Sequence, residues 1–225
     1  HIEVGTVTVR PQRGNPQPRL FRLPHDQALI NRMGFPGRGA EFVARQISNR
    51  RVSGLILGVN IGKNKDTPLE QAGDDYISLM RSFAPLADYL TVNVSSPNTV
   101  GLRRLQGRAA LNELLAELRR EKLTLETELG RHVPVLVKLA PDLTDEELDD
   151  ALEVILTHSM DGVIATNTTI SRDKLLSPHA REAGGLSGKP LFVRSLQMVS
   201  AIVQRAQGKL PVIGVGGIDS PASAQ

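Results

Sequence analysis

Short apolar runs alternate with amphipathic segments along most of the chain. Between the runs, apolar residues recur at helical spacing, as at Leu111, Leu114, Leu115 and Leu118. The runs are rich in β-branched residues, and each is short enough for a strand buried on both faces; they cover residues 2–7, 55–61, 89–94, 133–139, 162–165 and 211–215. Strands that alternate with helices predict a parallel sheet with right-handed crossovers, either doubly wound or closed as a β/α barrel.

Local signals mark where several helices begin and end. Gly130 follows the leucine-rich helix, and Gly208 follows a second amphipathic segment over residues 196–206. Thr144 and Glu147 have the spacing of a capping box. Pro190 stands where a first helical turn tolerates proline. We therefore expect one helix in the leucine-rich segment that Gly130 ends, one after Thr144 and one after Pro190.

The longest stretch without a helical or strand pattern covers residues 8–29 and is rich in Pro, Arg and Gln. It is too long for an ordinary connection between a strand and a helix. We interpret it either as a functional loop over a site or as a surface loop. With no linker or low-complexity segment in view, residues 1–225 are expected to form one domain.

Composition excludes several classes of function. The chain has no cysteine, which rules out a thiolate nucleophile, a disulfide and a Cys-ligated metal within it. Aromatic residues make up only 3%, so the stacking platforms of single-strand binders are missing and nucleic acid is not an expected partner. The net charge of +3 comes from interspersed basic and acidic residues, typical of a solvated surface. No apolar run of about 18 residues and no signal-peptide pattern is found.

The predicted strands share one feature at their carboxyl ends, which are the ligand-binding edge of parallel α/β folds. Each ends in small polar, amide, lysine or glycine residues: Thr6, Asn60, Asn93 to Asn98, Lys138, Thr166 to Thr168, and Gly216 with Gly217. The nearest carboxylates to these ends are Asp142 and Asp219, and no His and carboxylate cluster has metal-ligand spacing. Amides, hydroxyls and one lysine can orient a planar ligand but leave the difficult chemistry to a cofactor, as in hydride transfer.

Each of these features also has a purely structural interpretation. The amides around Asn93 could close an Asx turn, although a second amide-rich end at Asn167 suggests two groups facing one ligand. Lys138 could reach past the core to solvent, or could stabilise a ring that becomes anionic on reduction. Two glycine-rich segments, 184–188 and 214–220, could be ordinary turns or a two-part phosphate grip at the start of a helix.

Taken in order, the segments resemble dihydroorotate dehydrogenase in its class 2, quinone-linked form. The matching stretches are residues 2–8, 31–35, 60–66, 93–98, 138–142, 165–169, 184–188 and 214–220. The resemblance implies a parallel (β/α)8 TIM barrel, of which about six β/α units are visible, with FMN at its carboxyl-terminal mouth. It implies oxidation of (S)-dihydroorotate to orotate in de novo pyrimidine biosynthesis, with electrons passing from FMN to a quinone.

The resemblance also assigns roles to residues. Ser96 would be the base that takes the C5 proton while a hydride passes from C6 to the flavin; class 1 enzymes have Cys there, so Ser96 favours class 2. The residues expected to contact FMN are Thr6, Asn60, Asn93, Lys138, Thr166, Gly188 and Gly217. Those expected to bind the pyrimidine are Asn31, Arg32, Met33, Gly34, Phe35, Asn93, Asn98, Asn167 and Thr168. No metal is expected.

Some parts of the family pattern have no counterpart in this sequence. These are the first and last barrel strands and the amino-terminal helices that form the quinone site, so the chain is expected to be the middle of a longer enzyme. Quinone use and peripheral contact with a bacterial or mitochondrial inner membrane follow from the resemblance alone. Two alternatives stay open: another FMN barrel, such as an RNA dihydrouridine synthase, and an inactive barrel fragment.

Overall fold

One parallel sheet organises the molecule. The computed structural model describes residues 1–50 and 52–225. Its six-stranded sheet has the order β1-β4-β5-β6-β7-β9, with every neighbouring pair parallel. The strands are β1 (Ile2–Val7), β4 (Leu57–Ile61), β5 (Tyr89–Asn93), β6 (Val135–Leu139), β7 (Gly162–Ala165) and β9 (Val212–Gly214). Each lies within one of the six predicted apolar runs, so the strand predictions are confirmed.

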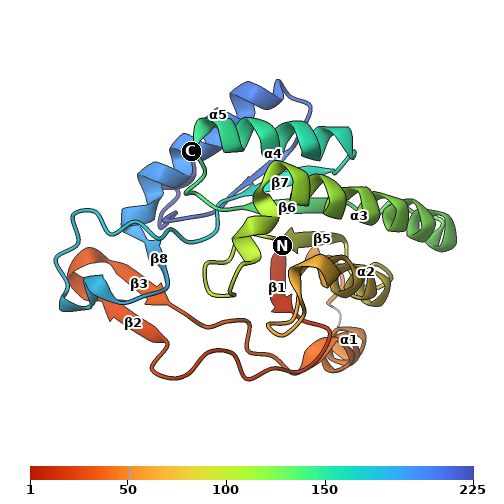
Figure 1. Cartoon of the computed structure of the whole chain (residues 1–225), viewed down its shortest axis with the longest axis horizontal. Helices are drawn as coiled ribbons and strands as arrows, with labels where there is room; N and C mark the ends of the chain where they lie inside the picture. Colours follow the sequence, from red (N-terminus) through yellow and green to blue (C-terminus); the bar gives the residue numbers. More distant parts are fainter. Residues whose placement is uncertain (51) are drawn as a thin grey trace.

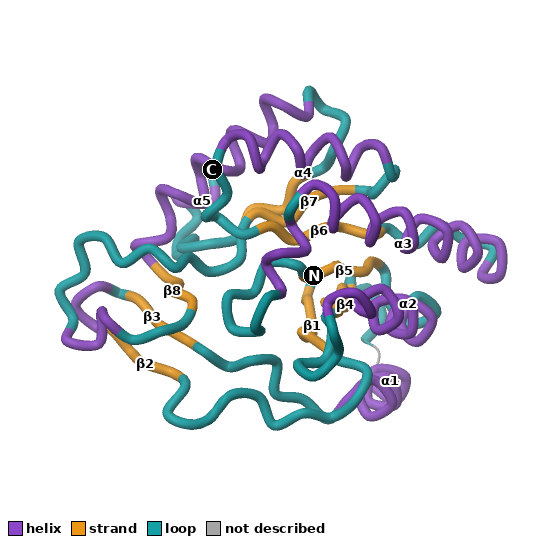
Figure 2. The backbone as a smooth tube through the Cα atoms, viewed as in Figure 1, coloured by secondary structure: helices purple, strands orange, loops and turns teal. Residues whose placement is uncertain are grey.

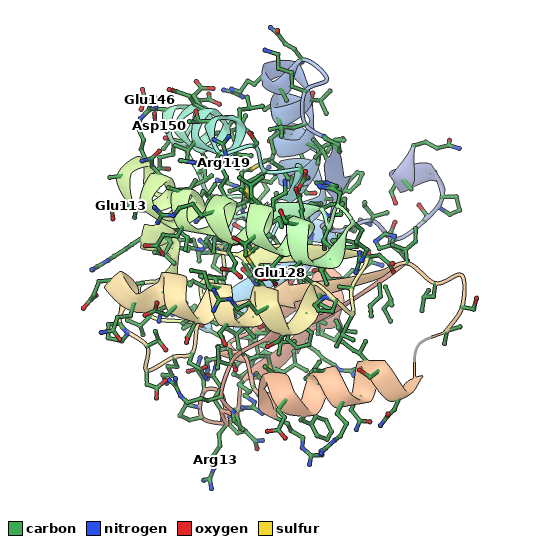
Figure 3. All side chains as sticks on the ribbon, turned by 90° about the vertical axis from the view of Figure 1, so that its right-hand side faces the viewer. Arg13, Glu113, Arg119, Glu128, Glu146 and Asp150 are labelled. Carbon is green, nitrogen blue, oxygen red and sulfur yellow. The ribbon has the colours of Figure 1, made fainter. Side chains whose placement is uncertain are left out.

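Five helices connect the strands and form a layer outside the sheet (Figure 1). They are α1 (Gly39–Arg50), α2 (Ala72–Phe83), α3 (Arg108–Leu129), α4 (Asp145–Thr157) and α5 (Phe192–Ala206). The main core lies between the two layers, where fully buried residues such as Val92, Leu115 and Ile155 pack together. Figure 3 shows charged side chains of α3 and α4, among them Glu113, Arg119 and Glu146, on the outer side of the helix layer. The alternation is that of a partial (β/α)8 barrel, as predicted.

The predicted helix boundaries are largely confirmed. In the capping box of α4, Thr144 Oγ1 accepts the Glu147 amide at 3.2 Å, and the Glu147 carboxylate accepts the Thr144 amide at 2.8 Å. Gly130 ends α3 in the left-handed region. Pro190 lies in the short 3-10 turn Lys189–Leu191 (η5) that leads into α5. α5 ends at Ala206, as predicted, with Gln207 in the left-handed cap position and Gly208 directly after it.

Residues 8–29 are not irregular throughout, so that prediction is wrong in part. Residues Leu20–Leu23 form β2 and Ala28–Asn31 form β3, and β3 pairs with β8 (Gly185–Gly188) in a small antiparallel sheet. The glycine-rich segment 184–188 is therefore mostly strand rather than turn. Phe21, Leu23 and Ile30 fill a separate small core with Leu186. Figure 2 shows this sheet standing apart from the helix layer. Four-residue strands with a distant partner leave little pattern in the sequence.

Candidate active site at the carboxyl ends of the strands

A polar cavity of about 180 Å³ opens at the carboxyl ends of the parallel strands. Its walls come from β1, β4, β5 and β6, from the segments that follow β5 and β7, and from the segment that begins at the end of β3. The lining residues are Glu3, Gly5, Thr6, Asn31, Met33, Gly34, Phe35, Asn60, Asn93, Ser96, Asn98, Lys138, Asn167 and Thr168. Twelve of these were predicted as site residues from the sequence, so the fold brings most of the predicted set together.

A network of amides and hydroxyls holds one wall of the cavity. Asn60 Oδ1 accepts hydrogen bonds from Thr6 Oγ1 at 2.6 Å and from Asn93 Nδ2 at 3.2 Å. Asn93 Nδ2 also donates to Thr6 Oγ1 at 2.9 Å. These three side chains come from the ends of β1, β4 and β5, which are neighbours in the sheet. Because each amide is fixed by its neighbours, its donor and acceptor positions are set before any ligand arrives.

The two amide-rich strand ends meet directly. Asn93 Oδ1 accepts the Ser95 amide at 3.2 Å, which is the local turn foreseen as the structural interpretation. The same oxygen lies 3.3 Å from Asn167 Nδ2, which also donates to Ser95 Oγ at 2.9 Å. The Asn167 oxygen accepts the Thr168 amide at 2.8 Å. Asn93 therefore closes a local turn and joins a shared site with Asn167.

Two charged side chains face the cavity, and only one of them was predicted. Lys138 Nζ lies 3.8 Å from Glu3 Oε1 and makes no hydrogen bond with any of the described residues. Glu3 is held more fully, by Asn60 Nδ2 at 2.9 Å and by Thr91 Oγ1 at 2.8 Å. The lysine is only 17% exposed. It thus presents a positive charge with free donors to the cavity rather than reaching solvent past the core.

Glu3 is not among the predicted site residues, because those lie at the carboxyl ends of the strands and Glu3 lies inside β1. A carboxylate inside an apolar run that predicts a buried strand was the available signal. The carboxylates named instead lie elsewhere. Asp142 forms an ion pair with Arg103 at 2.8 Å, and Asp219 accepts from Ser223 Oγ at 3.2 Å on the surface.

Ser96 stands on the wall formed by the segment after β5. Its side chain is 5% exposed, and its Oγ accepts the Asn98 amide at 3.2 Å. Asn98 Nδ2 in turn donates to Asn31 Oδ1 at 3.1 Å. Asn31 to Phe35 begin at the end of β3, so the small antiparallel sheet places this segment opposite Ser96.

The segment 31–35 rests on a second layer of hydrogen bonds. Gln12 Nε2 donates to the Gly34 and Phe35 carbonyls at 3.0 and 3.1 Å. Asn15 Nδ2 donates to the Arg32 and Asn98 carbonyls at 3.1 and 2.9 Å. The stretch 8–19 therefore supports the cavity from outside, which agrees with its interpretation as a functional loop.

Arg32 does not line the cavity, although it was predicted to bind substrate. Its guanidinium pairs with Glu182 at 2.8 Å and lies 4.6 Å over the ring of Phe21. The side chain is directed toward the segment before β8. Within the predicted stretch 31–35, Arg32 is the one residue outside the cavity wall.

Thr166, Gly188 and Gly217 lie outside the cavity wall, at the β7, β8 and β9 side of the molecule. The Thr166 amide donates to the Val215 carbonyl at 2.7 Å. A Cβ placed on Gly217 would lie 2.8 Å from the Gly188 carbonyl oxygen, so these two glycines approach each other. The predicted helix after 220 is only the 3-10 turn Ala222–Ala224 within the described residues.

A larger cavity of about 690 Å³ lies beside β8, η5 and the start of α5. His25, Lys174 and Arg194 are among its lining residues, and none of the predicted site residues lines it. We place the candidate site in the smaller cavity, because that one collects the fixed amides, the serine and the two opposite charges. Among residues 1–50 and 52–225, no group of three or more potential metal ligands comes together. No helix in that part of the chain is long and apolar enough to cross a bilayer.

Comparisons with known proteins agree with this geometry. The family model described as dihydroorotate dehydrogenase matches residues 1–224. The chain is 53% identical over 224 residues to dihydroorotate dehydrogenase (quinone) of Idiomarina loihiensis, covering 100% of this chain and 67% of the relative. It is 52% identical over 224 residues to the protein of the same name from Stenotrophomonas maltophilia, covering 99% of this chain and 64% of the relative.

Solved structures give the same result. The ligand-free DHODH of Eimeria tenella superposes with a TM-score of 0.92 at 42% identity, covering 99% of this chain and 67% of that chain. The complex of the Eimeria enzyme with ferulenol gives 0.90 at 41% identity, covering 99% of this chain and 64% of that one. The chain thus spans about two thirds of the length of its relatives. The match favours this family over an RNA-modifying flavin barrel, and the chain belongs to the dihydroorotate dehydrogenase family.

Proposed function

We propose that the protein carrying this chain oxidises (S)-dihydroorotate to orotate in pyrimidine biosynthesis, with FMN as cofactor and a quinone as final electron acceptor. The observation that carries the proposal is the position of Ser96 in a cavity that also collects fixed amides and hydroxyls, Lys138 and Glu3. Support comes from relatives that are 53% and 52% identical to the chain over 224 aligned residues and are named dihydroorotate dehydrogenase (quinone).

The residues present fit FMN by their chemistry. Asn60, Asn93 and Thr6 offer neutral donors and acceptors for a planar ring with amide-like edges. Lys138 offers a positive charge that would stabilise a ring becoming anionic on reduction. The paired glycines Gly188 and Gly217, with Thr166 near them, would accommodate the ribityl phosphate end. Bound FMN would accept the hydride that leaves C6 of the substrate.

The remaining part of the cavity wall would bind the pyrimidine. Asn31, Asn98 and Asn167 contribute amides to the lining of the cavity, and Asn98 Nδ2 donates to Asn31 Oδ1. Thr168, Met33, Gly34 and Phe35 complete this wall. Neutral amides can both donate to the carbonyls and accept from the N–H groups of such a ring. Arg32 would contribute only through its main chain, since its side chain is engaged with Glu182.

Ser96 would remove the proton from C5 of dihydroorotate. A serine hydroxyl is a weak base by its ordinary pKa, so the site must stabilise negative charge on Oγ. The Asn98 amide, which donates to Ser96 Oγ at 3.2 Å, supplies one such interaction. The low exposure of Ser96 keeps water from competing for the same proton.

The quinone step and membrane contact are proposed from the names of the relatives. We expect peripheral contact with a bacterial or mitochondrial inner membrane through a part of the protein outside this chain.

The experiment is flavin reduction by dihydroorotate in the full-length, FMN-loaded protein, followed without oxygen by absorbance. Ser96→Ala should reduce the rate at neutral pH by about 100-fold or more, the upper part of the range for general-base catalysis, while FMN stays bound. Ser78→Ala, an exposed serine on α2, is the matched control and should react like the wild type. An unchanged rate in Ser96→Ala would reject the assignment of the base.

A further inference from the structure

Arg103 contacts three strand ends with one side chain. It lies in the 3-10 turn Leu102–Gln106 (η3), between the segment that carries Ser96 and α3. Its Nε donates to the Ser95 carbonyl at 2.9 Å, and its Nη2 donates to the Thr168 carbonyl at 2.9 Å. Its Nη1 donates to Asp142 at 2.8 Å. The three partners lie in the segments that follow β5, β7 and β6. Each nitrogen of the guanidinium therefore donates to a different one of these segments.

The partners on the main chain belong to the candidate site. Ser95 directly precedes Ser96, and Thr168 itself lines the cavity. The Arg103 side chain does not line the cavity. Arg103 therefore touches the main chain behind both walls, at the points where Ser96 and Thr168 are presented.

Asp142 further restrains the Arg103 side chain and the segment after β7. Besides the pair with Arg103, its carboxylate accepts from Thr169 Oγ1 at 2.5 Å and from the Ile170 amide at 3.1 Å. The side chains of Arg103 and Asp142 are 22% and 14% exposed, so solvent screens the pair only partly. A planar guanidinium fixes its donors in one plane, which a lysine ammonium cannot reproduce.

We propose that Arg103 is a positioning residue that holds the segment of Ser96 and Asn98 at a fixed distance from the segment of Asn167 and Thr168. Loss of this contact lets the base shift relative to the amides that orient the pyrimidine. The proposal rests on the proposed function, because it concerns the base of that reaction. A misplacement of about 1 Å near reacting groups costs about 100-fold in rate.

The neighbouring Arg104 provides a matched control. It lies in the same turn and has the same side chain, but that side chain is exposed and makes no hydrogen bond or ion pair with any described residue. Alanine substitutions at the two positions each remove one positive charge from the protein. A difference in rate between the Arg103 and Arg104 variants therefore reports the contacts of the Arg103 side chain.

The test compares Arg103→Lys, Arg103→Ala and Arg104→Ala in the full-length, FMN-loaded protein. Anaerobic stopped-flow measures flavin reduction at saturating dihydroorotate. We expect Arg103→Lys and Arg103→Ala to lower the rate by about 10- to 100-fold, with FMN occupancy retained and Arg104→Ala at the wild-type rate. Millimolar guanidinium should restore at least part of the rate in Arg103→Ala, saturably, and leave Arg104→Ala and Ser96→Ala unchanged.

Three results are decisive. Wild-type rates in both Arg103 variants would overturn the proposal. Loss of activity in proportion to loss of FMN, without rescue by guanidinium, would also overturn it, because that is the behaviour of a residue needed only for folding. A wild-type protein that dihydroorotate does not reduce would instead reject the proposed function, and the role of Arg103 with it.

Discussion

Burial changes the acid-base behaviour of the two tyrosines of the chain. Burial raises the pKa of Tyr89 to about 12 from its ordinary value of 10.0, and the nearby Glu3 carboxylate adds to the effect. Burial also raises the pKa of Tyr76, whose hydroxyl donates to the Asn93 carbonyl at 2.8 Å behind the cavity. Both hydroxyls therefore stay protonated in the folded state at a pH where the unfolded chain ionises.

The consequence is a loss of stability at alkaline pH. Below pH 10 both states keep the Tyr89 proton and its contribution is fully present; above pH 10 only the unfolded state releases it, and the contribution is lost as pH rises toward 12. We expect the free energy of unfolding to fall by about 1 kcal/mol per tyrosine between pH 9 and 11.

Urea denaturation at pH 9 and at pH 11 measures this fall in the free energy of unfolding, and the Tyr89→Phe variant is measured for comparison. The variant should lose less stability over that interval than the wild type. The comparison cancels the opposite effect of Lys63, whose buried ammonium has a lowered pKa. An equal loss in both proteins would contradict the prediction.

Single residues also show where sequence reasoning about the site was limited. Asn60, Asn93 and Lys138 could be predicted because each ends a strand, and strand ends in a parallel sheet face the same way. The direction of the Arg32 side chain, away from the cavity, could not be predicted. It depends on an ion pair with Glu182, which only the fold brings close to Arg32. Membership of the matching stretch 31–35 did not indicate the direction of the Arg32 side chain.

At the scale of elements, local signals worked where the stabilising contacts are local. The capping box of α4 joins residues three apart, so its pattern is complete within the sequence. Strands β2 and β3 pair with each other and were not predicted, because the sheet is completed only by the pairing of β3 with β8, far along the chain. Their burial alternates along Leu20–Leu23, but four residues are too few for that alternation to be distinguished from chance.

The capping box gives a quantitative prediction for α4. Thr144→Ala removes the acceptor for the Glu147 amide and should lower the free energy of unfolding by about 1 kcal/mol. Thr127→Ala, at an exposed threonine in the last turn of α3, should be neutral or slightly stabilising because alanine favours helix. Urea denaturation of both variants measures the difference. Equal stability of the two would show that the cap contributes little in this fold.

At the scale of the whole molecule, the two glycine-rich segments matter because the fold brings them together. A Cβ on Gly217, at φ +74°, would lie 2.7 Å from Phe192 Cβ and 2.8 Å from the Gly188 carbonyl. Gly208 has nearly the same conformation, φ +77°, with no neighbouring atom within 4 Å. Substitution by alanine strains the backbone at both positions, but only Gly217→Ala displaces the end of β8.

Gly217→Ala should therefore weaken FMN binding in the full-length protein by about 10- to 100-fold, since overpacking costs about 1–3 kcal/mol. Gly208→Ala should leave the affinity unchanged. Quenching of flavin fluorescence during titration of the apoprotein measures the FMN affinity of both variants. If riboflavin, which lacks the phosphate, loses less affinity than FMN, the glycines act at the phosphate end. Equal FMN affinity in the two variants would place the phosphate elsewhere.

The alternation of the six parallel strands with helices, the capping box and the residues at each strand end follow from the sequence by itself. Hydrophobic period, capping and strand polarity depend on neighbours within one or two turns, so the chain carries them locally. Only the tertiary structure decided that Glu3 faces Lys138, that Asn93 meets Asn167, and that Arg103 joins three strand ends. Those contacts join residues far apart in the chain, and their directions depend on how the sheet curves and which elements pack beside it.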